Sequence, residues 1–327
     1  MVEVEERTDR DGEIVHSPDH IAVLSAAKEA LANGHRSATV SFKNSSLNDA
    51  NERAVVSILR ETGFEYVTGS GATHPFPKWL PRCESAVTEA YLSPILRQYL
   101  DSVGKGMGDG GELLVMSSAG GLIDRAGYRA IDSLLSGPAG GVVGAGAIAR
   151  AAGIKEFINL DMGGTSSDVS RYSGSFAYQS AHQVGDARIS SIAMKIETVA
   201  AGGGSICRVE DGLLRVGPQS AGAHPGPACY GFGGPLCLTD VNLLLGRLDP
   251  SRFSTPVSIE DAQDRLAEMI EQSGRSREAL LEGFLAVADD AMANAIRKVS
   301  TAEGYDPSIH TLQTFGGAGG QHACGVA

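Results

Sequence analysis

The feature that most constrains the fold of this chain is an apolar strand that leads directly into a pair of glycines. Residues 156–160 read Glu-Phe-Ile-Asn-Leu, which is typical of a buried strand, and residues 161–170 read Asp-Met-Gly-Gly-Thr-Ser-Ser-Asp-Val-Ser. Gly163 and Gly164 allow the backbone to turn sharply with its N–H groups exposed. The sequence therefore predicts a hairpin whose second strand returns through Asp168.

The composition of this turn suits an anion such as phosphate. Exposed backbone N–H groups bind phosphate oxygens, and the hydroxyls of Thr165 and Ser166 add donors. Asp161 stands at the end of the strand, where a carboxylate can hold a hydrated Mg²⁺ that neutralises phosphate charge. A glycine-rich β-turn without a ligand is the alternative, and for this motif in isolation it explains the residues equally well.

Two further glycine segments favour the ligand-binding interpretation. Residues 198–205 read Thr-Val-Ala-Ala-Gly-Gly-Gly-Ser. A predicted strand over 311–315 runs into Gly-Gly-Ala-Gly-Gly at 316–320, immediately before a predicted helix. Glycine permits a backbone approach that any Cβ would block, so these segments are expected to shape binding sites.

Small residues also dominate 136–146. Pro138 fits the first turn of a helix capped by Ser136, and the glycines and alanines that follow let that helix pack very close to another helix. The segment continues as Gly144-x-Gly146-x-x-Ala149, a nominal dinucleotide-binding fingerprint. That fingerprint belongs at a strand-to-helix turn, whereas these glycines fall within the helix, so a Rossmann site is disfavoured.

The N-terminal part of the chain alternates helices and strands, which is typical of a mostly parallel sheet covered by helices. The prolines of residues 71–81 predict a connecting loop. Apolar periodicity and turn signals predict strands over 37–42 and 64–67 and helices over 20–33, 48–61, 83–100, 258–273 and 277–303.

Composition excludes several classes of protein. With 327 residues and a hydrophobic content of 42%, the chain can bury a substantial core, in about two domains. Its net charge of −12 is spread along the sequence, which argues against a surface that binds nucleic acid or an anionic membrane. No apolar run approaches the roughly 18 residues of a membrane span, and residues 1–7 are acidic where a signal peptide is basic. Five scattered cysteines without a C-x-x-C pair suit reduced thiols, so we expect a soluble cytoplasmic protein.

The order of the motifs resembles that of the actin, hexokinase and chaperone ATPase superfamily. The small-residue helix, the strand before DMGGTSSDVS and the strand that ends in FGGAGG resemble its connect-1, phosphate-2 and adenosine motifs. The phrases LLSGPAGGVVGA, LDMGGTSSDVSRY, TVAAGGGS, VGPQSAGAHPGPACYGFGGPLCLTDVNLLLGRLDP and FGGAGGQHACGVA are similar to the hydantoinase A / 5-oxoprolinase family. The resemblance covers almost the whole chain, more loosely over residues 1–110, and the RY and QHA after two of the motifs favour the 5-oxoprolinase branch.

The resemblance implies an α/β protein with the actin/hexokinase-like ATPase fold, which is built of ribonuclease H-like lobes. Residues 1–140 would be the remainder of the first lobe, and residues 141–327 would be the second, nucleotide-binding lobe. Members of the family open with a first phosphate loop of the kind Asp-x-Gly-Gly-Thr-Phe-Thr-Asp, and this sequence holds no second copy of such a loop. We therefore expect an incomplete fold, an internal fragment that lacks the N-terminal phosphate loop.

The implied activity is ATP-dependent hydrolysis of a cyclic amide, either 5-oxoproline to glutamate, as in glutathione metabolism, or a hydantoin. The γ-phosphoryl group would activate the ring carbonyl oxygen before water attacks the carbon. The alternative is a non-catalytic nucleotide-binding or assembly subunit of a hydantoinase or ketone carboxylase complex. The implied cofactors are ATP and Mg²⁺. The implied partners are the cyclic amide and a hydantoinase B-type subunit or domain, in a homo- or hetero-oligomer, with neither nucleic acid nor membrane.

Phosphoryl transfer is catalysed mainly by positioning and charge neutralisation, so the implied site residues are those that hold metal and phosphate. Asp161 would anchor Mg²⁺ and, with Thr165, form the catalytic pair. Asp168 would have only a structural or supporting role. The residues expected to contact the nucleotide are Gly163, Gly164, Thr165, Ser166, Gly202, Gly203, Gly204, Gly316, Gly317 and Gly319.

A further hypothesis concerns His224 and Asp240, which are candidate metal ligands or parts of the substrate pocket, with Cys229 between them in the sequence. The alternative is structural, because a histidine in a Pro-Gly loop more often orders the backbone through hydrogen bonds. Nothing in the sequence around Cys229 marks it as an activated nucleophile. Both interpretations of His224 and Asp240 remain open from the sequence.

Overall fold

The chain forms two compact units in the computed structural model. The first unit comprises Met1–Gly140 together with Tyr178–Met194, and the second comprises Gly141–Ala177 together with Lys195–Ala327. Within the described residues, no helix is both long enough and apolar enough to cross a membrane. The residues that the structure describes are 1–108, 111–185, 187–253 and 255–327.

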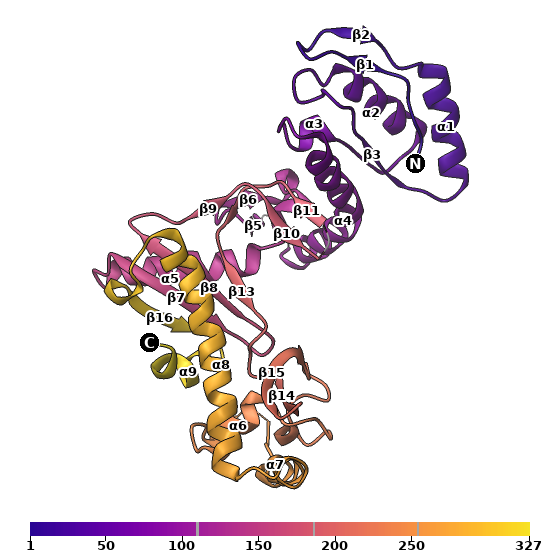
Figure 1. Cartoon of the computed structure of the whole chain (residues 1–327). Coiled ribbons are helices and arrows are strands. Elements are labelled where there is room, and N and C mark those ends of the chain that lie inside the picture. Colours follow the sequence, from indigo (N-terminus) through magenta and orange to yellow (C-terminus); the bar gives the residue numbers. More distant parts are fainter. Residues whose placement is uncertain (109–110, 186, 254) are drawn as a thin grey trace. The chain divides into compact units, whose positions relative to one another are not determined.

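The first unit contains a two-stranded parallel sheet, short antiparallel strand pairs and the helices packed on them (Figure 1). β3 and β4 run parallel, as the alternation of helices and strands predicts, and the other pairs are antiparallel. The elements are β1 (Arg7–Thr8), β2 (Ile14–His16), α1 (His20–Ala32), β3 (Ser37–Val40), α2 (Ala50–Thr62), β4 (Tyr66–Gly69), α3 (Ser70–Thr73), α4 (Trp79–Gly106), β5 (Leu114–Met116), β6 (Leu122–Asp124), η1 (Arg125–Gly127), η2 (Ala130–Ser133), β9 (Tyr178–Gln179), β10 (His182–Val184), β11 (Ala187–Ile189) and β12 (Ala193–Met194).

The proline-rich segment 71–81 is partly helical, so the prediction of a continuous loop is wrong. α3 covers its first residues, and α4 begins at Trp79, with Pro81 as its third residue. Proline is tolerated there because the N–H groups of the first helical turn have no partner within the helix. The predicted start near residue 83 is therefore about one turn too late.

A buried polar cluster connects α2, α3 and α4. The Glu52 carboxylate accepts hydrogen bonds from the Phe42 N–H at 2.8 Å, the Ser70 hydroxyl at 2.6 Å and the Gly71 N–H at 2.8 Å. Arg82 is fully buried and donates to the Phe42 carbonyl oxygen and to the Ser70 hydroxyl. Because both charged side chains are buried and hydrogen-bonded, removing either would leave the other uncompensated. The cluster fixes the segment after β3 against the start of α4.

The second unit is centred on a four-stranded sheet with the strand order β13-β8-β7-β16. β7 (Glu156–Met162) and β8 (Ser167–Ser173) form the predicted hairpin, with Asp161 directly opposite Asp168 in the register. β16 (Thr311–Phe315) lies parallel to β7, and β13 (Glu197–Val199) lies antiparallel to β8. The sheet is therefore mixed, because β7 and β16 form its one parallel pair within the described residues.

Alternate residues of β7 face opposite sides of this sheet. The even-numbered residues from Ile158 to Met162 belong to the main hydrophobic core, together with residues of α8 (Arg277–Val299). Figure 1 shows α8 running along β8 on this side. Phe157 and Asp161 instead face α5 (Ser136–Ala151), whose glycines approach them. The alternation therefore directs the Asp161 carboxylate away from the apolar core.

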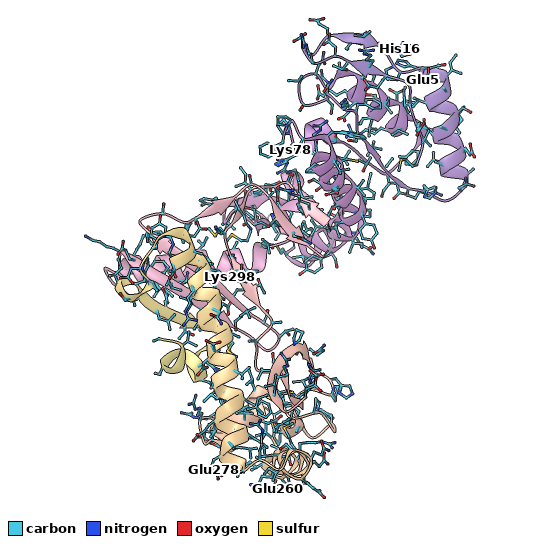
Figure 2. The ribbon with its side chains drawn as sticks, in the orientation of Figure 1. Glu5, His16, Lys78, Glu260, Glu278 and Lys298 are labelled. Atoms are coloured by element: carbon cyan, nitrogen blue, oxygen red, sulfur yellow. The ribbon has the colours of Figure 1, made fainter. Side chains whose placement is uncertain are left out.

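The ends of α7 and α8 follow ordinary helix rules. Ser258 and Ser276 cap the two helices through hydrogen bonds to backbone N–H groups. Glu260 and Glu278 lie in their first turns, where a carboxylate interacts favourably with the helix dipole (Figure 2). α8 ends at Val299 rather than at the predicted residue 303, because the backbone leaves helical geometry and continues as a 3₁₀ turn.

The remaining elements of the second unit pack around α8 and follow the second and third glycine segments. They are β14 (Ser205–Glu210), β15 (Leu213–Ser220), η3 (Ala228–Tyr230), α6 (Leu238–Leu244), η4 (Pro250–Arg252), α7 (Ile259–Ser273), η5 (Thr301–Glu303), η6 (Pro307–Ile309) and α9 (Gly319–Val326).

Candidate functional site

The turn between β7 and β8 presents a row of free backbone donors. The turn is closed by a hydrogen bond from the Gly163 N–H to the Ser166 carbonyl oxygen at 3.1 Å. Among the residues that the structure describes, the N–H groups of Gly164, Thr165 and Ser166 have no acceptor. A Cβ on Gly163 or Gly164 would meet no atom within 4 Å, so the turn borders open space. Successive backbone N–H groups without an acceptor are a common feature of anion-binding turns.

Two carboxylates lie beside this turn on one face of the sheet. Asp161 is opposite Asp168 in the β7–β8 register, and Asp168 is opposite Thr198 in the β8–β13 register. The Thr198 hydroxyl donates to the Asp168 carboxylate at 2.6 Å. In the described part of the chain, the Asp161 carboxylate accepts no hydrogen bond and has no cationic partner. Burial, and next the Asp168 charge, raise the pKa of Asp161, and burial raises the pKa of Asp168.

The second glycine segment braces the first turn. The Gly203 N–H donates to the Gly163 carbonyl oxygen at 3.0 Å, and the Gly204 N–H donates to the Gly164 carbonyl oxygen at 2.6 Å. A Cβ on Gly202 would lie 2.7 Å from the backbone of the same turn. The atoms nearest to that Cβ include the backbone nitrogens of Thr165 and Ser166, so glycine is required at 202 by its close approach to the 163–166 backbone.

The third glycine segment also touches the end of β7. The Ala318 N–H donates to the Met162 carbonyl oxygen at 3.0 Å. Gly316 has φ of +86°, and a Cβ on it would overlap the Met162 carbonyl oxygen and lie 2.6 Å from Asp161 Oδ1. Gly317 instead borders open space, with no atom within 4 Å of a Cβ built on it. The first and third turns are thus in direct contact, because they follow the neighbouring parallel strands β7 and β16.

The N-terminal part of α9 continues from this third turn. A Cβ on Gly319 would overlap the Thr314 hydroxyl, which explains glycine at that position. His322 follows the third glycine segment in the sequence and lies within α9, where its side chain is fully buried. Its Nδ1 lies 2.6 Å from Asp289 Oδ1, and its Nε2 lies 3.1 Å from the Asn242 amide nitrogen. This network ties α9 to α8 and α6.

The small-residue helix α5 covers the carboxylate side of the sheet. A Cβ on Gly141 would lie 2.9 Å from the Phe315 ring and 3.5 Å from Asp161 Oδ2. A Cβ on Gly146 would lie 2.7 Å from the Phe176 ring. The glycines thus permit close packing on aromatic side chains, whereas the sequence predicted close packing on another helix. Ser136 is the first helical residue and not the cap, although Pro138 does lie in the first turn.

The residues predicted to hold metal and phosphate are thus gathered at one place. The first and third turns follow the carboxyl ends of the parallel strands β7 and β16, which is where open α/β sheets bind ligands. The second glycine segment is hydrogen-bonded to the carbonyl oxygens of Gly163 and Gly164 in the first turn. No described group of three or more His, Cys, Asp or Glu side chains is arranged to hold a metal ion.

His224 and Asp240 are not brought together as a ligand set. His224 is exposed, with its ring 5.2 Å from the Phe232 ring. The Asp240 carboxylate is fully buried and accepts from the N–H groups of Ala228, Cys229 and Cys237 at 2.8 to 3.0 Å. These bonds account for a buried aspartate at this position and favour the structural alternative. Burial, and next the Asp240 charge, raise the pKa of Cys229 well above its ordinary value, so this thiol is not activated.

Sequence reasoning missed two residues that shape the site. Thr198, the middle residue of β13, supports Asp168, and its position four residues before the glycine run was the only available signal. Thr239 fixes the second glycine segment, because both its N–H and its hydroxyl donate to the Gly203 carbonyl oxygen, at 2.8 and 2.9 Å. Both contacts depend on long-range pairing, which a single sequence does not display.

Comparisons with known proteins converge on one family. The sequence model described as "Hydantoinase/oxoprolinase" matches residues 82–327, and the model of the "Hydantoinase/oxoprolinase N-terminal region" matches residues 1–63. The 5-oxoprolinase PfmaA of Pestalotiopsis fici is 43% identical over 314 residues, which cover 90% of this chain and 24% of that protein. The chain thus spans about a quarter of the length of this relative.

Two solved structures are similar over nearly the whole chain. The ATP-dependent caprolactamase from Pseudomonas jessenii superposes with a TM-score of 0.85 at 31% identity, covering 99% of this chain and 49% of that one. The nucleotide-free structure of acetone carboxylase, from a study of ATP-dependent acetone carboxylation, superposes with a TM-score of 0.82 at 26% identity, covering 99% and 48%. The predicted α/β ATPase fold of this family is confirmed.

Proposed function

Because the chain belongs to the hydantoinase/oxoprolinase family, we propose that it supplies the nucleotide-binding turn of an ATP-dependent enzyme that opens a cyclic amide, 5-oxoproline or a hydantoin. The observation that carries this proposal is the row of free N–H groups from Gly164 to Ser166 beside the Asp161 carboxylate. Bound ATP would supply the phosphoryl group that converts an amide carbonyl oxygen into a better leaving group.

The residues of the turn have distinct roles in this proposal. The N–H groups of Gly164, Thr165 and Ser166 would bind phosphate oxygens, and the exposed Thr165 hydroxyl would add a donor. The Gly163 N–H donates to the Ser166 carbonyl oxygen, so the role of Gly163 is to close the turn. Gly317 would leave room for the nucleotide, since its Cβ position is open.

The surroundings of Asp161 fit a hydrated Mg²⁺. Asp161 and Asp168 are neighbouring carboxylates, and neither has a cationic partner among the described residues. A divalent cation would relieve their repulsion, and Mg²⁺ commonly uses one or two carboxylates and keeps several waters. Asp161 has its oxygens free and would hold this hydrated ion. Asp168 has one oxygen engaged by Thr198 and would help to orient the hairpin.

The remaining parts of the proposal concern the larger protein. We assign residues 141–327 to the nucleotide-binding lobe and residues 1–140 to the remainder of the first lobe, and the division between compact units at Gly140 and Gly141 supports this boundary. A hydantoinase B-type subunit or domain would complete the enzyme in an oligomer. All five cysteines are free, which suits the cytoplasm, and hydrolysis of 5-oxoproline to glutamate would give the enzyme a role in glutathione metabolism.

One observation favours a second candidate function. The acetone carboxylase structure superposes on nearly all of the chain, and its title describes ATP-dependent carboxylation of a ketone. A ketone, like a cyclic amide, presents a carbonyl oxygen that a phosphoryl group can activate. The chain would then be a nucleotide-binding or assembly subunit of a ketone carboxylase complex.

Isothermal titration with Mg-ATP tests the assignment of the metal and phosphate turn. Asp161→Asn should weaken binding by about tenfold or more, since it removes the charge that holds the ion. Asp168→Asn is the matched control, because it replaces an oxygen of the neighbouring carboxylate by the same NH2 group, and it should weaken binding far less. Equal losses in the two variants would show that the metal assignment is wrong.

Phosphate release distinguishes the two functions. The chain is assayed alone and together with a hydantoinase B-type subunit, with 5-oxoproline, hydantoin, or acetone plus bicarbonate. The amide hydrolase is supported if a cyclic amide stimulates phosphate release and if Asp161→Asn abolishes that release. Stimulation by acetone plus bicarbonate alone would overturn it in favour of the carboxylase subunit.

A further inference from the structure

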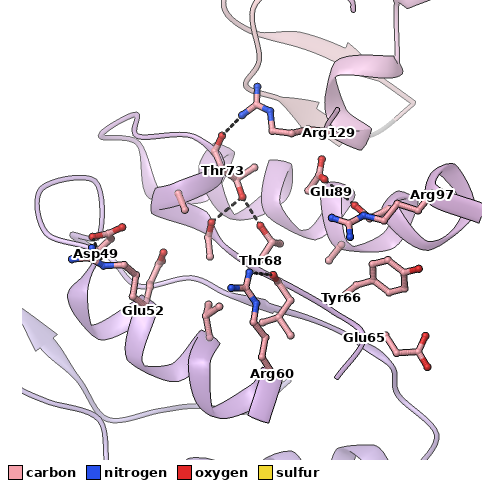
Figure 3. Close-up of a pocket in the computed structure, with 17 residues that line it drawn as sticks. Asp49, Glu52, Arg60, Glu65, Tyr66, Thr68, Thr73, Glu89, Arg97 and Arg129 are labelled. Carbon is pink, nitrogen blue, oxygen red and sulfur yellow. Dashed lines mark hydrogen bonds and ion pairs between the residues drawn. The ribbon is translucent and has the colours of Figure 1, made fainter. Parts of the chain in front are cut away.

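A polar groove lies within the first unit, outside the site described above. It has a volume of about 590 Å³, which is in the range of small-molecule sites. One face of α2, the strand β4, the short helix α3 and one face of α4 line it, with Arg129 at one end (Figure 3). Eight of its lining residues are charged, four acidic and four basic, so its recognition properties depend on which charges are already paired.

Two carboxylates of the groove, buried Glu52 and half-buried Glu89, are engaged by hydrogen bonds within the protein. Glu52 accepts three hydrogen bonds in the cluster with Ser70. Glu89 accepts from the N–H groups of Ala130 and Ile131, at 3.2 and 2.9 Å, and from the Ser93 hydroxyl at 2.8 Å. Both acids therefore belong to the framework of the unit, and neither is available to a ligand.

Two of the arginines are also engaged. Arg53 pairs with Asp49 at 3.1 Å across one turn of α2. Arg129 forms a two-pronged pair with Asp132, at 2.8 and 2.9 Å, and donates to the Thr73 carbonyl oxygen at 2.8 Å. Bidentate pairing of this kind fixes the guanidinium in place.

Three charged side chains remain uncommitted at the β4 end of the groove. Among the described residues, Arg60, Arg97 and Glu65 form no ion pair. Arg60 is held against β4 by one hydrogen bond, from Nη2 to the Val67 carbonyl oxygen at 3.2 Å, which leaves its other N–H groups free. The guanidinium carbon of Arg97 lies 5.5 Å from the centre of the Tyr66 ring. Arg60 comes from α2 and Arg97 from α4, and both side chains line the groove (Figure 3).

We propose that this groove binds a small acidic amino acid, a molecule with two carboxylates and one ammonium group. The two guanidinium groups are planar forks suited to carboxylates, and they come from opposite walls, so they suit two carboxylates on one short chain. The Glu65 carboxylate is the complementary partner for the ammonium. The groove thus offers two positive charges and one negative charge that form no ion pair with any described residue, and these are complementary to the two negative charges and one positive charge of the ligand.

The complementary charges also define what the groove rejects. A dicarboxylate without an ammonium group leaves Glu65 unpaired next to added negative charge. An amino acid amide offers only one carboxylate to the two arginines. Selectivity in this groove therefore resides in Glu65 as much as in Arg60 and Arg97, since specificity depends on repulsion as well as attraction.

Equilibrium dialysis of the 327-residue chain against radiolabelled L-glutamate, with unlabelled glutarate as competitor, tests this proposal. Glutarate has the same two carboxylates and lacks the ammonium. We expect L-glutamate to bind about threefold more tightly than glutarate, and Arg60→Gln and Arg97→Gln each to weaken glutamate binding about fivefold, in keeping with charge pairs at partly exposed sites. L-glutamate is also the product expected from hydrolysis of 5-oxoproline, so the variants of the groove residues, and not binding alone, assign the ligand to this groove.

The Glu65→Gln variant tests directly whether Glu65 recognises the ammonium group. It should bind glutamate and glutarate equally, because the charge that recognises the ammonium is gone. Arg10→Gln is the matched control, since Arg10 is an exposed arginine of the same unit outside the groove, and it should leave binding unchanged. Absence of glutamate binding in the unaltered chain, binding that both groove arginine variants leave intact, or an unchanged preference in Glu65→Gln would each overturn the proposal.

Discussion

Replacing Gly316 by alanine tests how closely the third turn sits against β7. The position has φ of +86°, and left-handed backbone costs an L-residue roughly 1–2 kcal/mol. The added Cβ would overlap the Met162 carbonyl oxygen and lie 2.6 Å from Asp161 Oδ1, and forced overpacking of this kind costs about 1–3 kcal/mol. The two effects act together, so we expect a loss of about 2–5 kcal/mol, a large part of the stability of a typical domain.

Thermal unfolding followed by circular dichroism measures this loss. For a unit of this size, the expected destabilisation lowers the melting temperature by about 5–15 °C. Gly317→Ala is the matched control, because Gly317 has no left-handed φ and its Cβ would meet nothing within 4 Å. It should melt close to the unaltered protein and yet weaken Mg-ATP binding, since its methyl group would enter the space proposed for the nucleotide. A Gly316→Ala protein as stable as the Gly317→Ala protein would refute the reasoning.

Three further predictions follow from the second unit. Burial, followed by the Asp240 charge, raises the pKa of Cys237 to about 12, and the pKa of Cys229 is raised as well. At pH 8 a thiol reagent should therefore label exposed Cys324, and mass spectrometry should find Cys229 and Cys237 unlabelled until the protein unfolds. Asp240→Asn should destabilise the fold by about 2–4 kcal/mol in chemical denaturation, because an amide cannot satisfy three N–H donors, whereas the exposed cap variant Asp249→Asn should not. Burial and the Asp168 charge raise the folded-state pKa of Asp161 above its unfolded value, so the folded protein loses stability as the pH rises through that pKa and the carboxylate becomes charged. At pH 7 without Mg²⁺, Asp161→Asn should therefore have a higher melting temperature than the unaltered protein. The difference should vanish at pH values below the unfolded pKa. Early labelling of Cys229, an Asp240→Asn protein of normal stability, or a lower melting temperature for Asp161→Asn at pH 7 would contradict these statements in turn.

The parts of the site that the sequence predicted are those written in contiguous residues. The apolar run before Asp161 and the paired glycines after it specify a strand and a turn locally, so the β7–β8 hairpin was expected. The strand before Gly316 was expected for the same reason. The family resemblance then indicated that these segments belong to one site.

The parts that could not be predicted depend on pairing between distant segments. The Gly203 and Gly204 N–H groups donate to carbonyl oxygens of the first turn, a contact between segments about 40 residues apart that the sequence does not display. The position of Thr198 opposite Asp168 depends on the register of a three-residue strand. Pro81 was taken as a loop residue because proline breaks helices, although it is tolerated in a first turn. In each case, local chemistry allowed several outcomes and tertiary contacts selected one.

The central claim is that the free N–H groups of the 161–170 hairpin bind the phosphates of a nucleotide, and amide NMR tests it most directly. The protein is labelled with ¹⁵N at glycine, threonine and serine and titrated with the Mg²⁺ complex of a non-hydrolysable ATP analogue. The account predicts that the resonances of Gly164, Thr165 and Ser166 shift saturably and together, while that of Gly163, which is bonded to the Ser166 carbonyl oxygen, shifts less. Saturable binding that leaves those three resonances unmoved would contradict the account.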